Sequence, residues 1–71
     1  MKKRDELADT TSCLNRAKED ELLFVLLGRD RAAPFAIRAW TAHRIRLGLN
    51  SANDAQIAEA LACADAMEAQ P

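Results

Sequence analysis

Apolar residues follow two different patterns in the first half of the chain. Residues 13–27 begin as an amphipathic stretch and end in a continuous apolar run, Leu22 to Leu27, directly before Gly28. A helix that ends at this glycine is the first interpretation. A short strand over Leu23–Leu27 is the alternative, because periodicity alone does not classify a compact apolar run. Such a strand would need a partner from another subunit, since the sequence offers no second strand candidate.

The middle of the chain has clear helix start and stop signals. Pro34 suits a first helical position and Gly48 suits the residue after a helix end, which predicts a helix over Pro34–Leu47. At about 100° per residue, its apolar residues fall on two sides, so we expect packing from more than one direction. The first side holds Ala36, Ile37, Trp40 and Leu47, and the second holds Phe35, Ala39 and Ala42.

A third helix is predicted over Asp54–Ala69, a segment rich in alanine, the best helix former. Ser51 with Asp54 has the spacing of a capping box, and Asn53 with Gln56 offers a second register. The apolar stripe of this helix repeats at steps of three and four, and its alanines allow a second helix to approach closely. The stripe consists of Ile57, Ala60, Leu61, Ala64 and Met67.

These patterns predict an all-α fold, a small bundle of two to three helices. Residues 1–12 are polar and are expected to form a flexible arm, and residues 13–71 a single small helical domain. A chain of 71 residues is near the lower limit for an independent core. Cys13 and Cys63 match no metal-ligand spacing and are expected to be reduced, partly buried thiols. Oligomerisation is therefore expected to complete the bundle.

Charge is unevenly distributed although the net charge is only −1. Residues 28–50 hold five arginines and one aspartate, whereas residues 51–71 hold four acidic residues and no Lys or Arg. The slight negative total argues against binding of duplex DNA, which favours a basic domain. The first ten residues resemble no secretion signal, and the longest apolar run is too short to span a bilayer. We therefore expect a soluble, cytoplasmic protein.

Residues 24–34, FVLLGRDRAAP, followed by Ile37-Arg38-Ala39-Trp40, carry a resemblance to a known family. The chain resembles small uncharacterised proteins of tailed phages and prophages, with an F-V-L-x-[GA]-x-D-x-x-A-P-x-x-[IV]-R-x-W pattern, and the likeness extends over most of residues 22–68. The resemblance implies a phage source, hence the cytoplasm of a bacterial host, but no chemistry. A small phage protein of this kind is expected to inhibit a host defence.

Catalytic and metal-binding patterns are nearly absent, so we expect neither an enzyme nor a cofactor or metal site. Binding of an anion is the better hypothesis, because the arginine fork fits phosphate and aromatic faces can stack on a base. Arg44 lies within an apolar stripe and should meet either a bound anion or Asp65 or Glu68. The candidate ligand-binding residues are Arg29, Arg31, Arg38, Trp40, His43 and Arg44.

Two functional hypotheses follow. The first is an oligomeric sponge that sequesters a phosphate-bearing nucleotide signal and so silences a defence effector. The second is a protein-directed, anti-CRISPR-like inhibitor that uses its acidic C-terminal helix on a host defence protein. A phage accessory or structural role is a third alternative. The clustered arginines favour the first hypothesis, and the acidic last segment suits the second.

Overall fold

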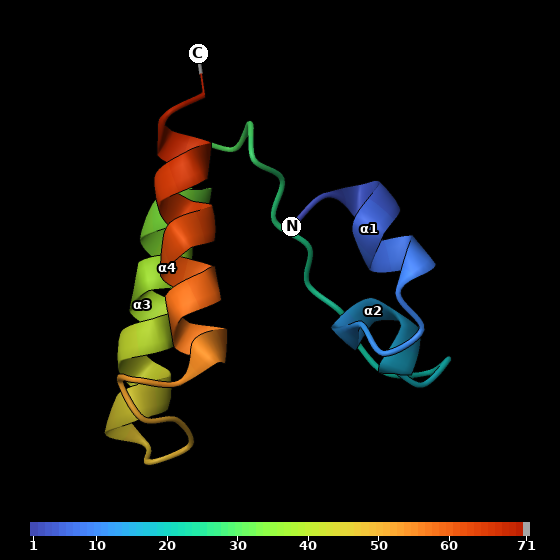
Figure 1. The fold of residues 1–71 in the computed structure, drawn as a ribbon, viewed down its shortest axis with the longest axis horizontal. Coiled ribbons are helices and arrows are strands. Elements are labelled where there is room, and N and C mark those ends of the chain that lie inside the picture. Colours follow the sequence, from blue (N-terminus) through green and yellow to red (C-terminus); the bar gives the residue numbers. More distant parts are fainter. Residues whose placement is uncertain (71) are drawn as a thin grey trace.

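The computed structural model describes residues 1–70, and within them it contains four helices and no strand. They are α1 (Lys3–Ala8), α2 (Cys13–Arg16), α3 (Ala33–Arg46) and α4 (Ala55–Glu68). α3 and α4 lie side by side as an antiparallel hairpin, and α1 packs against α2 (Figure 1). The predicted all-α class is confirmed.

The bounds of α3 agree with the predicted helix to within one residue at each end, and its capping explains why. Pro34 lies in the first turn. At the other end Gly48 has φ = 75°, the left-handed conformation that glycine adopts without a steric penalty. The N–H of Gly48 donates to the carbonyl of Ile45, and the N–H of Leu49 to that of Arg44. This pair of bonds is a Schellman motif, which satisfies carbonyls that the helix end would leave free.

α4 begins one residue later than predicted, and only half of the predicted capping box forms. The Asp54 carboxylate accepts a hydrogen bond from the N–H of Ser51 at 2.9 Å, as in a capping box. Asp54 itself, however, is the N-cap residue, so the helix starts beyond this turn. The hydrogen bonds from Ser51 and from the Asn50 side chain lower the pKa of Asp54.

The core of the hairpin consists mainly of small residues. Ala33, Ile57 and Ala64 are buried, and Ile57 is the only large side chain among residues 1–70 that is almost fully buried, with 1% exposed. The predicted stripe of α4 therefore faces α3, with Leu61 at its edge. The prediction that α3 is packed from two directions is wrong within one chain. α4 covers a single face of α3, and Phe35 on the second side is 78% exposed.

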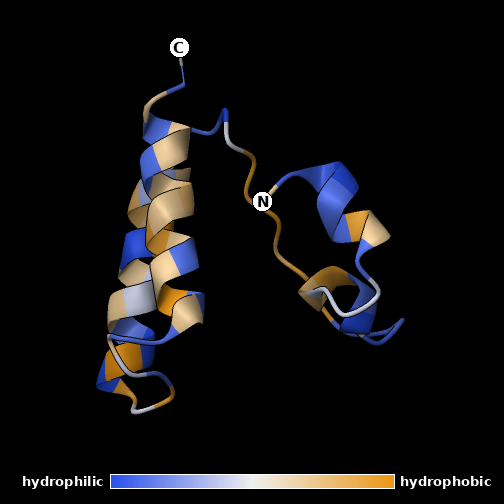
Figure 2. Cartoon of the chain, viewed as in Figure 1, coloured by the Kyte–Doolittle hydropathy of each residue, from blue (hydrophilic) through white to orange (hydrophobic). Residues whose placement is uncertain are grey.

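The helix predicted for residues 13–27 is wrong beyond Arg16, and the alternative strand over Leu23–Leu27, which needs a partner from another subunit, does not form within residues 1–70. Only Cys13–Arg16 is helical, and residues 17–27 form neither helix nor strand. A turn at 18–21, in which the N–H of Glu21 donates to the carbonyl of Lys18, separates the two parts. A short helix without a packed face is marginal in water, and a strand has no partner in this chain. The apolar run therefore spans the gap between the two helix pairs (Figure 2).

Polar contacts hold α1 and α2 together. Ser12 caps α2 by accepting from the N–H of Asn15, and its hydroxyl donates to the carbonyl of Glu6 at 2.7 Å. The Asn15 side-chain amide donates to the same Glu6 carbonyl and to the carbonyls of Leu7 and Asp9. The N-terminal residues 1–12 thus include a six-residue helix. The division into a flexible arm and one domain stays a prediction.

Two smaller expectations concern the cysteines and the membrane. Cys13 is exposed rather than partly buried, Cys63 is half-buried, and both are free thiols. Between the two helix pairs, the Met1 ammonium nitrogen lies 4.0 Å from the Cys63 Sγ. None of the helices described in residues 1–70 has the length and apolar character that a membrane crossing requires.

Candidate anion-binding site

The six predicted ligand-binding residues do not share one surface. Arg29 and Arg31 precede α3, Arg38 faces α4, and Trp40, His43 and Arg44 follow on the second half of α3. With a rise of about 1.5 Å per residue, Arg44 lies roughly 15 Å along the axis from the start of the helix. The structure thus separates the predicted surface into three groups with different partners.

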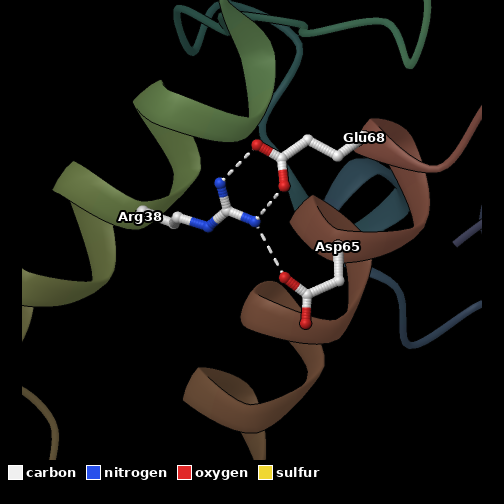
Figure 3. Close-up of polar contacts among 3 residues, drawn as sticks. All are labelled: Arg38, Asp65 and Glu68. Atoms are coloured by element: carbon white, nitrogen blue, oxygen red, sulfur yellow. Dashed lines mark hydrogen bonds and ion pairs between the residues drawn. The ribbon is translucent and has the colours of Figure 1, made fainter.

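Arg38 is engaged in ion pairs across the hairpin (Figure 3). Its two terminal nitrogens donate to both carboxylate oxygens of Glu68, and Nη2 also donates to Oδ1 of Asp65, each at 2.8 Å. These hydrogen bonds raise the pKa of Arg38 and lower that of Glu68. Arg38 is therefore committed to two acids of its own chain, and it takes the partners that the sequence suggested for Arg44.

Arg44 forms no ion pair with an acid of residues 1–70. Its Nε donates to Oδ1 of Asn50 at 2.6 Å, and its guanidinium carbon lies 5.5 Å from the centre of the Trp40 ring. The Asn50 amide in turn donates to Asp54 and Gln56. The expected pairing with Asp65 or Glu68 is wrong, because this half-buried guanidinium contacts an amide oxygen and an aromatic face instead, and the alternative of a bound anion stays a prediction. Trp40 remains 42% exposed.

His43 is an exposed residue on the last turns of α3. Within residues 1–70 no hydrogen bond involves its side chain. It lies in the last turn of α3 with Arg44 and Arg46, whose positive charges are favoured by the negative end of the helix dipole.

Arg29 and Arg31 line a hollow with a volume of about 450 Å³, formed where the start of α3 meets the end of α4. In the described part of the chain neither guanidinium takes part in an ion pair. Gly28 allows the close approach at one wall, since a Cβ there would lie 3.1 Å from Oε1 of Gln70. Pro34 and Met67 supply apolar parts of the lining. Two unpaired arginines thus share a concave surface.

The acidic groups at the hollow are already engaged. One carboxylate oxygen of Asp30 accepts from the N–H of Ala32 at 2.9 Å, and its carbonyl accepts from the N–H of Ala33. Both oxygens of Glu68, another lining residue, are bonded to Arg38. Asp30 therefore occupies backbone amides at the start of α3, where a phosphate could otherwise bind, and the guanidinium groups are the cationic donors that remain.

Sequence reasoning missed the wall that α4 contributes. Gly28, Met67 and Gln70 border the hollow together with the two arginines. No local pattern marks the end of α4 as part of a site, because it reaches Arg29 only through the antiparallel return of the chain. The Gly28–Arg31 sequence was a usable signal, since glycine next to arginine favours close approach of a ligand or a second segment.

The hollow was also compared with the requirements of a metal site, and the chain with known proteins. Among residues 1–70, no three His, Cys, Asp or Glu side chains lie close enough together to hold a metal ion. No protein-family model, curated protein or solved structure matches the chain.

Proposed function

We propose that the chain acts by binding rather than catalysis, and that it captures a phosphate-bearing nucleotide at the hollow beside Arg29 and Arg31. The observation that carries the proposal is the pairing state of the arginines. Arg38 is committed to Asp65 and Glu68, and Arg44 to Asn50 and Trp40, whereas Arg29 and Arg31 have no ion-pair partner in residues 1–70.

The dimensions and chemistry of the hollow support a small anionic ligand. Its volume of about 450 Å³ lies within the range of small-molecule sites, roughly 300–1,000 Å³. The guanidinium groups of Arg29 and Arg31, which are separated by one residue, can each donate two parallel hydrogen bonds to a phosphate. The apolar lining from Pro34 and Met67 offers contact to the less polar parts of a nucleotide.

The biological role that we attach to this capture follows from the resemblance of residues 22–68 to small phage proteins. A phage protein that removes a nucleotide signal in the host cytoplasm would silence the defence effector that the signal activates. The alternative of an inhibitor that uses an acidic C-terminal helix has less support. Arg38 already pairs with Asp65 and Glu68, the two acids on the last turns of that helix, and offsets part of their negative charge.

Calorimetry tests the proposal with cyclic dinucleotides, ADP-ribose and inorganic phosphate as probes. Wild type is expected to bind at least one nucleotide, and Arg29→Gln with Arg31→Gln is expected to abolish the heat of binding. Arg46→Gln, which removes an exposed arginine at the far end of α3, serves as the matched control and should bind normally. The proposal fails if wild type binds none of these probes, or if the double variant binds as well as the control.

A further inference from the structure

Residues 22–27 form the largest exposed apolar segment of the chain. Leu22 is 97% exposed, Phe24 87% and Val25 68%, and Leu23 and Leu27 are each at least half exposed. Contiguous apolar surface of this kind marks an interaction site. The connection between α2 and α3 is therefore the part of the molecule that most needs a partner.

The backbone of this segment is also without partners. In the described residues no backbone N–H of Leu22–Leu27 donates a hydrogen bond, and only the carbonyl of Leu27 accepts one, from the N–H of Asp30. The segment runs extended between α2 and α3 (Figure 1). Within its sequence, LLFVLL, Phe24 and Val25 belong to the residue types that are enriched in strands. An extended segment with free donors and acceptors can pair with a second strand.

We propose that residues 22–27 pair antiparallel with the same segment of a second copy of this chain, around a two-fold axis near Phe24. This inference specifies the partner for the oligomer that the sequence predicts, and it goes beyond the proposed nucleotide binding. A two-fold arrangement uses one surface twice and closes on itself. It brings the two Phe24 side chains to the centre, where aromatic cross-strand pairs stabilise a ribbon.

Charge selects the direction of pairing. The segment is preceded by three acids, Glu19-Asp20-Glu21, and followed by Arg29 and Arg31. Antiparallel pairing places the acidic end of each copy beside the basic end of the other. Parallel pairing would place acid beside acid and arginine beside arginine, which is unfavourable. Because both contacts use the same arginines as the hollow, self-association and anion binding are expected to oppose each other.

Sedimentation equilibrium without nucleotide tests this inference independently of the proposed function. Wild type is expected to show a dimer, or a multiple of two, that dissociates on dilution. Phe24→Asp should give a monomer with an unchanged helical circular dichroism spectrum, because Phe24 supports no packing within the chain. The matched control is Phe35→Asp, an apolar residue of similar exposure on α3, which should keep the wild-type mass.

A charge variant tests the direction. Glu19→Lys with Asp20→Lys should raise the dissociation constant by at least about tenfold, because like charges then meet at both ends. A charge reversal of the same kind on α4, Glu59→Lys, should leave the dissociation constant unaltered. A wild-type monomer throughout the concentration range, a Phe24→Asp variant of unchanged mass, or tighter association of the Glu19/Asp20 variant would each overturn the proposal.

Discussion

The two halves of this molecule use their apolar residues in opposite ways. In the α3–α4 hairpin the buried positions are filled mainly by small residues, with Ile57 as the one large side chain of residues 1–70 that is almost fully enclosed. In residues 17–27 the large apolar side chains lie outside any intrachain core. The hairpin is therefore held by close approach, capping and ion pairs, whereas the hydrophobic side chains of the preceding segment remain exposed.

The largest effect should come from the centre of the hairpin. Ile57→Ala is expected to lower the free energy of unfolding by about 2–4 kcal/mol, the typical loss for a buried isoleucine. Urea denaturation followed by Trp40 fluorescence measures this change. Leu61→Ala on the same helix is the matched control and should cost clearly less, because Leu61 is 39% exposed. Equal losses at the two positions would contradict the description of the core.

The end of α3 should be the next most sensitive position. Gly48→Ala is expected to destabilise the hairpin by about 1 kcal/mol, because any residue with a Cβ is strained at a φ of 75°. Gly28→Ala makes a useful contrast, since Gly28 has no positive φ and the tightest contact of its new Cβ would be with the movable tip of Gln70, beside an ordinary contact with Met67. Thermal melts of both variants should separate them, and a larger loss at Gly28 would refute the assignment of strain.

Arg38 should give a smaller effect that depends on pH. The pKa of Glu68 is lowered from its ordinary value of 4.5 by hydrogen bonds from Arg38. A depressed folded pKa contributes stability above the unfolded value, and this stability is lost as pH falls through the folded pKa. Arg38→Met is therefore expected to reduce stability at neutral pH and to flatten its decline below about pH 4.5.

The comparison variant for this experiment is Arg46→Met, which removes the same charge from an exposed position on α3. It should keep the wild-type decline at acid pH, because the Arg38 cluster and the lowered pKa of Asp54 are intact. Thermal melts from neutral to acid pH measure both curves. Identical curves for Arg38→Met and wild type would show that these exposed ion pairs do not stabilise the hairpin.

The least effect on the hairpin is expected from a change in the N-terminal pair. Ser12→Ala removes both the cap of α2 and the bond to the Glu6 carbonyl, which should loosen α1 and α2. Neither helix packs against α3 or α4, so the hairpin should keep its stability. Hydrogen exchange followed by mass spectrometry should show faster exchange in residues 3–16 alone. Faster exchange in residues 33–68 as well would mean that the two halves are coupled.

Local signals predicted α3 and α4 well because their ends are decided by local chemistry. Pro34 and Gly48 set the limits of α3, and the alanine-rich stripe set the buried face of α4. Residues 17–27 were predicted less well, because a compact apolar run contains no local signal that fixes its conformation, and the rest of residues 1–70 supplies no strand to pair with it. A run such as LLFVLL is typical of a buried segment, but it does not specify whether the segment is a helix or a strand.

The candidate site was predicted less well than the fold because it depends on tertiary pairing. Arg38 and Arg44 both lie on the same helix among apolar neighbours, and their sequence contexts do not distinguish their partners. Only the hairpin geometry assigns Asp65 and Glu68 to Arg38 and leaves Asn50 for Arg44. The sequence places Arg29 and Arg31 directly ahead of α3. It does not indicate that Met67 and Gln70 line the same hollow.

Hydrogen exchange at two protein concentrations tests the contrast between the two halves most directly. The account predicts slow exchange in α3 and α4 at both concentrations. Amides of residues 22–27 should exchange almost freely in dilute protein and become protected in concentrated protein, when a second copy supplies their hydrogen-bond partners. Free exchange of residues 22–27 at every concentration, with α3 and α4 protected throughout, would contradict the claim that this segment is a surface for self-association.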